Sequence, residues 1–365
     1  MPVARAGVVG ALGVLLLGAR ALGQTPAGAS EPKPSDCLKE EKSIRPQDVP
    51  GNAAIEYFKV WDSLPAAEFE LVTHFGNVAF AQNDPIKLSP PQRDLCLKHQ
   101  EFIEGLMRCA AMDTCDWGAQ RALGEEMRLP HLRFLRFSYR ALLMDFYRCL
   151  EDRSAQGAAM RLAAIIRMVR HTRTDGTWFS SLVTSGHAQG VVEHTGEFLK
   201  SGIATPATAK LLLDAFTGVR KANPFEWKEA FEWELWNRTQ WPRTICAGDA
   251  AGAKYIEVQG GPDSFWPKTP APWFIEGFGQ QRLYSDLDRY KGYLEKTVPL
   301  WSDPANEVTL REGLVEAMEG QFGAVACVQA HGLELMRSNL MRARRQMSQV
   351  ETDLVTFIKK AELQP

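Results

Sequence analysis

The stretch from Ser89 to Trp241 carries apolar residues at helical spacing in one segment after another, and this pattern constrains the fold most. The segment that begins at Pro130 shows it clearly, because its apolar residues recur at intervals of three and four. We find no run of strand length in which apolar and polar residues alternate. The sequence therefore predicts an all-α protein. The apolar face after Pro130 consists of Leu135, Tyr139, Leu142, Leu143, Phe146, Tyr147 and Leu150.

Short polar breaks separate these segments, which favours antiparallel helical hairpins stacked side by side. Such stacking occurs in an α-solenoid and in an irregular bundle, and the sequence leaves both open. A stripe from Leu162 to Val169 predicts one further helix between two of the longer ones. We expect the other helices at 53–64, 90–112, 130–150, 178–200, 206–221 and 224–236.

Residues 242–304 differ in character, because they are rich in Pro, Gly and Trp. We expect a loop-rich insert here with one short helix at 284–296, and long loops in compact proteins are often functional. Residues 307–360 return to a helical pattern that four glycines interrupt or soften. The predicted organisation is a single helical domain over 52–365 that includes this insert.

Residues 1–23 have the pattern of a secretory signal peptide. Arg5 precedes an apolar run from Gly7 to Gly18, and Ala21 and Gly23 supply the small residues of a cleavage site. The run is shorter than a membrane-spanning helix, although an uncleaved N-terminal anchor is the alternative. We expect cleavage, a flexible leader over 24–51 and a periplasmic or extracellular location, with no integral membrane span left after cleavage.

Charge and composition exclude several classes of protein. The chain has 42 Lys and Arg against 44 Asp and Glu, which gives a formal net charge of -2. A strongly basic nucleic-acid-binding protein is excluded, so we expect no nucleic-acid partner. Hydrophobic residues make up 45% of the chain, which is the level of a folded protein rather than of a disordered acidic one.

The seven cysteines are disulfide candidates, because an exported protein meets an oxidising compartment. If 92–110 and 131–150 pair as an antiparallel hairpin, Cys96 and Cys149 lie within about one helical turn. We predict a Cys96–Cys149 disulfide and a local Cys109–Cys115 disulfide. Cys246–Cys327 is a further candidate pair, and Cys37 is left over. No Cys-x-x-Cys occurs, so the expected role is structural rather than redox.

Several short stretches resemble a group of uncharacterised exported bacterial proteins. They are Asn52–Tyr57, Cys115–Gly118, Leu129–Leu132 and Arg170-His171, and the resemblance covers roughly 52–235. It implies an all-helical fold and carries no established activity. Members of that group often end in a Gly-x-Tyr-Pro turn, which Phe357–Lys360 lacks.

One helix carries the best candidate metal ligands. His194 and Glu197 are three residues apart and could contact one ion. His187 shares their face two turns away, and His171 could approach from the preceding antiparallel helix. The alternative is that these are separate polar residues among apolar neighbours, since the spacing matches no recognised metal motif. We expect no cofactor.

A tryptophan-rich stretch supplies candidate binding residues, because Trp stacks on sugar rings and is favoured at protein interfaces. The alternative is that these rings pack the long loops onto the helices. An arginine row that includes Arg161, Arg167 and Arg170 could bind phosphate or carboxylate, or form a solvated face. The tryptophans are Trp227, Trp233, Trp236, Trp241, Trp266 and Trp273.

No Gly-x-Ser-x-Gly, phosphate-binding loop or His-Glu-x-x-His occurs in the chain. We therefore expect an exported helical scaffold or binding protein without catalysis, whose partner is an envelope protein or polysaccharide. The alternative is an all-helical hydrolase or lyase that acts on envelope polysaccharide. That enzyme would use carboxylates near the tryptophans, such as Glu226, Glu229, Glu232 and Glu234, although no acid–base pair is singled out.

Overall fold

The computed structural model describes residues 33–39, 43–65, 86–222, 228–245, 280–297 and 324–363, with single positions at 68, 72, 75, 300, 310, 312 and 313. These residues form α-helices and two 3-10 helices, and none of them lies in a strand. The predicted all-α class is confirmed. The predicted signal peptide lies outside the described residues, as do most of the 242–304 insert and the side chains of Cys37, Cys246 and Cys327.

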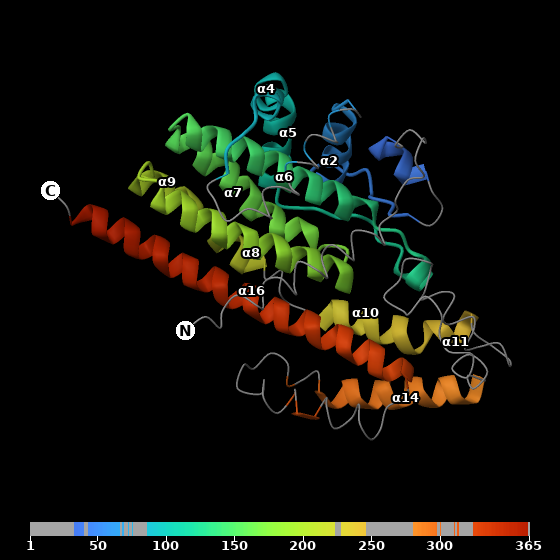
Figure 1. Ribbon diagram of the computed structural model, residues 1–365. Helices are drawn as coiled ribbons and strands as arrows, with labels where there is room; N and C mark the ends of the chain where they lie inside the picture. Colours follow the sequence, from blue (N-terminus) through green and yellow to red (C-terminus); the bar gives the residue numbers. More distant parts are fainter. Residues whose placement is uncertain are drawn as a thin grey trace. The chain divides into compact units, whose positions relative to one another are not determined.

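Figure 1 shows the helices, coloured from blue to red along the chain. The contacts between residues divide the chain into two compact units. The larger unit holds most of the helical series and the end of α16, and the smaller one holds η2, α10, α11, α14 and the start of α16. The bounds are η1 (Pro34–Lys39), α2 (Ala53–Asp62), α4 (Pro90–Lys98), α5 (Gln100–Ala111), η2 (Arg121–Glu126), α6 (Pro130–Glu151), α7 (Ala155–Thr172), α8 (Trp178–Lys200), α9 (Pro206–Ala222), α10 (Lys228–Thr239), α11 (Trp241–Ile245), α14 (Gln280–Thr297) and α16 (Ala324–Glu362).

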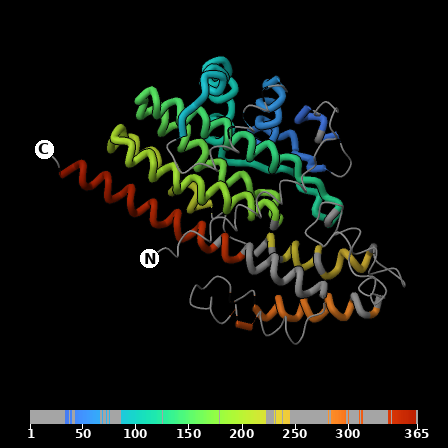
Figure 2. Tube along the Cα trace, viewed as in Figure 1, coloured from blue at the N-terminus to red at the C-terminus, as the bar shows by residue number. Residues whose placement is uncertain are grey.

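Helices α4 to α9 of the larger unit pack in a regular order. α4 contacts α6, which contacts α8, and α5 contacts α7, which contacts α9. α7 also contacts α6 and α8, so it is the central helix of the unit. The trace in Figure 2 shows α6, α7, α8 and α9 running alongside one another. The small and apolar side chains of α7 allow this close approach, and most of them are buried.

Local sequence signals set several helix ends. Asn52 caps α2 as predicted, because its side-chain oxygen accepts a hydrogen bond from the Ala54 N–H. Thr177 caps α8 in the same way through the Ser180 N–H. Pro130 and Pro206 occupy the first turns of α6 and α9, where a missing N–H costs nothing.

Two predicted helices differ from the structure. The segment expected as one helix over 90–112 is divided into α4 and α5 at His99, whose backbone angles are φ -112 and ψ 38. From Ala324 on, the C-terminal segment is more regular than expected, since α16 continues through Gly332 without a break, while Gly320 and Gly323 lie outside the described residues. A single helical glycine costs only about 1 kcal/mol, which the rest of a long helix can offset.

Part of the stretch expected as a flexible leader belongs to the larger unit. η1 forms over Pro34–Lys39, and Ile44 is fully buried. The Arg45 N–H donates to the Gly118 carbonyl. Gly118 has φ +61, and a Cβ there would lie 1.9 Å from the Arg45 carbonyl oxygen, so this contact needs glycine.

Aromatic rings fill the core between α2 and the start of α6. Trp61 and Trp117 stack with their ring centroids 6.0 Å apart, and Phe134 stacks on Trp61 at 5.1 Å. The Trp61 indole N–H donates to the Ser138 hydroxyl at 2.7 Å. The stretches 52–57 and 115–118, which carry the resemblance described above, belong to this core. Buried aromatic pairs whose N–H groups are hydrogen-bonded contribute strongly to stability.

In the smaller unit, α10 contacts α11, α14 and η2. Arg243 of α11 pairs with Asp288 of α14 at 2.5 Å, and its guanidinium lies over the Tyr284 ring. The predicted short helix of the insert is therefore observed, with wider bounds, as α14. Within the described residues, no helix has both the length and the apolar character needed to cross a membrane.

Two glycines of α8 provide a matched test of packing. A Cβ at Gly190 would lie 2.1 Å from the hydroxyl oxygen of buried Tyr139, whereas a Cβ at Gly196 would meet nothing within 4 Å. We expect Gly190→Ala to lower the free energy of unfolding by about 1–3 kcal/mol through overpacking. Gly196→Ala should raise it by about 0.5–1 kcal/mol through helix propensity. Denaturant unfolding of both variants checks this, and equal effects would contradict it.

Candidate functional site

The predicted contact between His194 and Glu197 is present on α8. His194 Nδ1 lies 3.2 Å from Glu197 Oε2, and the Tyr147 hydroxyl of α6 donates to that oxygen at 2.5 Å. Burial raises the pKa of Glu197, but hydrogen bonds from His194 and Tyr147 outweigh it and leave the pKa below its usual range. The charged Glu197 carboxylate therefore links α8 to Tyr147 of α6.

His187 lies on the same helix but is part of a different contact. Its ring stacks on Tyr139 with centroids 4.7 Å apart, and its Nδ1 lies 3.4 Å from the Thr172 hydroxyl. Burial lowers the pKa of His187 to about 3, and the positive charges of Arg136 and Arg140 add to this effect. The ring is therefore neutral at pH 7 and serves as a packing surface.

His171 lies apart from the α8 histidines and fastens α7 to two other segments. Its Nε2–H donates to the Met112 carbonyl at 2.9 Å, and its Nδ1 accepts from the Tyr57 hydroxyl at 3.2 Å. Burial lowers the pKa of His171 to about 4, with a further contribution from Arg170. Both ring nitrogens are thus used. Across the described part of the chain, no three His, Cys, Asp or Glu side chains are grouped so as to hold a metal ion.

The sequence analysis missed a buried pair between His131 and Asp175. His131 Nε2 lies 2.7 Å from Asp175 Oδ2, and both side chains are fully buried. Asp175 also accepts from the Thr177 N–H at 2.8 Å, and the His131 ring stacks on Trp117. This geometry orients an imidazole as in a base–carboxylate pair, yet the ring is closed off from solvent. The signal available in the sequence was an acidic residue, Asp175, in the short break before α8.

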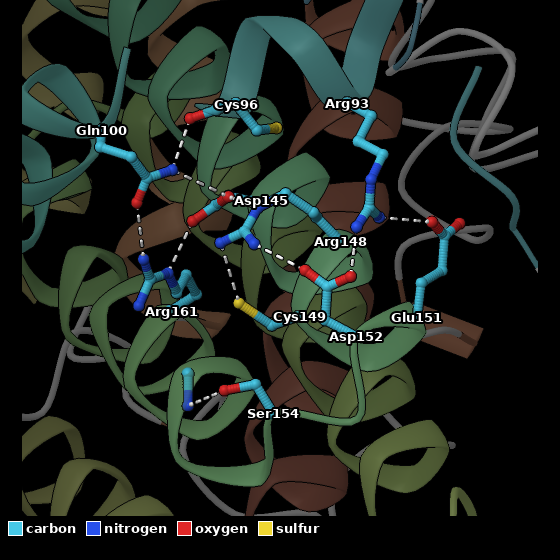
Figure 3. Close-up of polar contacts among 11 residues, drawn as sticks. Arg93, Cys96, Gln100, Asp145, Arg148, Cys149, Glu151, Asp152, Ser154 and Arg161 are labelled. Atoms are coloured by element: carbon cyan, nitrogen blue, oxygen red, sulfur yellow. Dashed lines mark hydrogen bonds and ion pairs between the residues drawn. The ribbon is translucent and has the colours of Figure 1, made fainter. Parts of the chain in front are cut away.

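A second buried feature is the network around Asp145, which Figure 3 shows. Its carboxylate accepts from Arg148 Nε at 2.6 Å and from Arg161 Nε at 2.7 Å. Gln100 accepts from Arg161 at 3.2 Å, so the network joins α5, α6 and α7. Asp145 is fully buried, and it is the sole acidic residue between 130 and 150. A single carboxylate among the apolar residues of 141–147 was the sequence signal for this network.

The two predicted disulfides are wrong. Cys96, Cys109, Cys115 and Cys149 are buried free thiols. α4 and α6 do pack together as the hairpin argument required, but side chains of the Asp145 network lie between Cys96 and Cys149 in Figure 3. Arg148 donates to the Cys149 sulfur at 3.4 Å. The Cys149 sulfur thus contacts a side chain of the network and is not bonded to Cys96.

Burial also makes these four thiols unreactive. It raises the pKa of Cys109 to about 12, and it raises the pKa of Cys96, Cys115 and Cys149 as well. Because the thiolate is the reactive form, we expect a thiol reagent to modify these four residues only after unfolding. Peptide mapping with an alkylating reagent, before and after denaturation without reductant, measures this. Recovery of a Cys96–Cys149 linked peptide would contradict it.

Two of the three described tryptophans of the predicted binding set, Trp233 and Trp241, are buried in the smaller unit. The Trp233 indole N–H donates to the Arg121 carbonyl at 3.1 Å. Trp241 is buried against η2, where a Cβ at Gly124 would lie 2.4 Å from its ring. Trp236 is half-buried. Packing is thus the observed role of Trp233 and Trp241, while Trp227, Trp266 and Trp273 lie outside the described residues.

A groove on the larger unit runs along α7 between α5 and α9. Its volume is about 480 Å³. α7 supplies the floor, α5 one wall, and Leu211 of α9 the other. Small side chains leave this space open, since Ala111, Ala163 and Ala164 line it. Volumes of roughly 300–1,000 Å³ are typical of small-molecule sites. The remaining lining residues are Glu104, Met107, Arg108, Gln156, Met160 and Arg167.

Comparisons of the chain with protein-family models, with curated proteins and with solved structures give no match.

Proposed function

We propose that this chain is an exported binding protein, which holds a ligand without transforming it. The observation that carries the proposal is the groove along α7, whose size suits a small molecule. Its floor belongs to the central helix of the larger unit, and packed helices hold a site more rigidly than loops do. In this proposal, the hairpins stack as in an α-solenoid, and the α5–α7–α9 face is the binding face.

The environments of three buried histidines support a binding function over a catalytic one. His171 and His187 are buried and have a lowered pKa, so neither is poised to exchange protons near pH 7. His131 is closed off with Asp175. Each of these imidazoles serves a contact between segments instead. By contrast, the groove is lined mainly by side chains that bind through shape and apolar contact.

The hydrolase alternative has less support from the described part of α10. Trp233 is buried, and its indole N–H is used by a backbone carbonyl. Glu234 is buried while Glu232 is exposed. A polysaccharide-cleaving site would need two carboxylates facing one cleft, roughly 5–10 Å apart. Binding therefore remains our proposal.

Two measurements on the full chain test the proposed function. Expression in a bacterial host, fractionation and N-terminal sequencing should give an envelope or extracellular protein that begins at Gln24. Retention in the cytoplasm with Met1 intact would contradict export. Denaturation of the exported protein, followed by solvent extraction and mass spectrometry, should recover a small molecule in near-equal molar amount. Release of new reducing ends from envelope polysaccharide by the purified protein would contradict a purely binding role.

A further inference from the structure

Different kinds of side chain line the two ends of the groove along α7. Arg170 donates to the Met112 carbonyl at 2.5 Å, which aligns the C-terminal ends of α5 and α7. Arg108 and Arg167 therefore lie toward one end of the groove, while Gln156 of α7 lies toward the other. Met107 and Met160 line the part between them. Along α7, Met160 and Arg167 are separated by about 10 Å.

Arg167 differs from Arg161 and Arg170, the other two arginines of α7, in its lack of an ion-pair partner among the described residues. Arg161 is bound by Asp145, and Arg170 is bound by Asp113 and by backbone carbonyls. Arg167 is half-buried and forms no ion pair or hydrogen bond with any residue that the structure describes. Burial and the charge of Arg170 lower the pKa of Arg167, and Asp214 of α9 only partly opposes them. A half-buried guanidinium that forms no ion pair favours binding of an anion.

The apolar side chains that line the groove indicate the chemistry of the rest of the ligand. Methionine side chains are flexible and polarisable, so they adapt to an apolar chain. The alanines of the floor offer apolar surface with no polar group to orient a sugar. Glu104 lies on α5 one turn before Arg108, and it forms no ion pair with Arg167.

We propose that this groove binds a single-chain anionic amphiphile, with the apolar chain on Met107, Met160 and Ala163 and the anionic head on Arg167. The head is a carboxylate or a phosphate, both of which a guanidinium binds through paired N–H groups. This inference rests on the proposed function and names the ligand class of the same groove.

Calorimetric titration of the purified chain with decanoate, decyl phosphate and decanol tests the proposal. We expect one site per chain for the two anions and binding about tenfold or more weaker for decanol. Arg167→Gln should weaken anion binding by a similar factor and leave decanol binding nearly unchanged. Ala111→Phe fills the groove from its exposed rim and should weaken all three ligands. Arg220→Gln is the matched control, because Arg220 is exposed and pairs with Glu351 away from the groove.

Three outcomes would overturn the proposal. They are no heat of binding with either anion at millimolar concentration, equal affinity for decanoate and decanol, and unchanged anion affinity in Arg167→Gln. Thermal unfolding of each variant confirms that the fold is kept. Recovery of a sugar or a peptide from the exported protein would also overturn the proposal, but would leave the proposed function standing. Failure of export would do the reverse, since the titration does not depend on location.

Discussion

Asp145→Ala should lower the free energy of unfolding by about 3–5 kcal/mol, because it removes the carboxylate that two nearly buried guanidinium groups share. Arg148 keeps its ion pair with Asp152, whereas Arg161 is left without a carboxylate partner among the described residues. Arg148 and Arg161 have only 12% and 11% of their side chains exposed, so water cannot replace the lost partner fully. Asp145→Asn keeps one acceptor oxygen and should cost less. Denaturant unfolding followed by far-ultraviolet circular dichroism measures both.

Asp113→Ala is the matched control for the Asp145 prediction. Asp113 also pairs with an arginine, Arg170, at 3.2 Å, but its side chain is 94% exposed. An exposed pair of this kind contributes about 0–1 kcal/mol. The contrast between the two aspartates therefore isolates the effect of burial. Losses of similar size in Asp145→Ala and Asp113→Ala would contradict the structural role assigned to the Asp145 network.

Acid should destabilise the protein well before its carboxylates are protonated. The pKa of His171 is lowered to about 4 and that of His187 to about 3, against 6.5 for an ordinary histidine. The unfolded chain therefore takes up these two protons first as the pH falls. The stability that the neutral rings provide is fully present above pH 6.5 and is lost progressively toward pH 4 and pH 3. From pH 7.5 to pH 5, each ring should account for about 2 kcal/mol.

Unfolding free energies at pH 7.5 and pH 5 for three chains test this acid sensitivity. His187→Phe keeps a ring that can stack on Tyr139 but removes the titrating group, so its loss between the two pH values should be about half that of the parent chain. Thr172→Val is the control, because it removes the hydroxyl beside His187 and keeps the titrating ring. An acid loss in His187→Phe as large as in the parent chain would contradict the assignment.

Much of the helical framework could be predicted because its causes are local. The start of α8 at Trp178 and its end at Lys200 follow from a capping threonine and a Ser-Gly break, which the chain carries next to the helix. Pro130 and Pro206 likewise mark the starts of α6 and α9, because proline fits the first turn of a helix. The break at His99 could not be predicted in this way. It has no glycine or proline signal, and it depends on how α4 and α5 pack.

The site could be predicted only where its members share one helix. His194 and Glu197 contact each other because three residues along an α-helix place side chains on one face. His171 was expected to join them, but packing turns it toward Tyr57 and Met112 on other elements. The pairing of His131 with Asp175 was missed for the same reason, since neither residue suggests the other in the sequence.

By itself, the sequence determined the all-α class and most helix bounds, because helix periodicity, caps and proline positions act over a few residues. Tertiary structure alone decided that Cys96 and Cys149 remain thiols beside an ionic network, and that small alanines leave a groove along α7. It also decided that Arg167 lies in this groove without an ion pair among the described residues. These outcomes depend on which helices meet and on the angle and depth of their contact, and side chains far apart in the chain set those jointly.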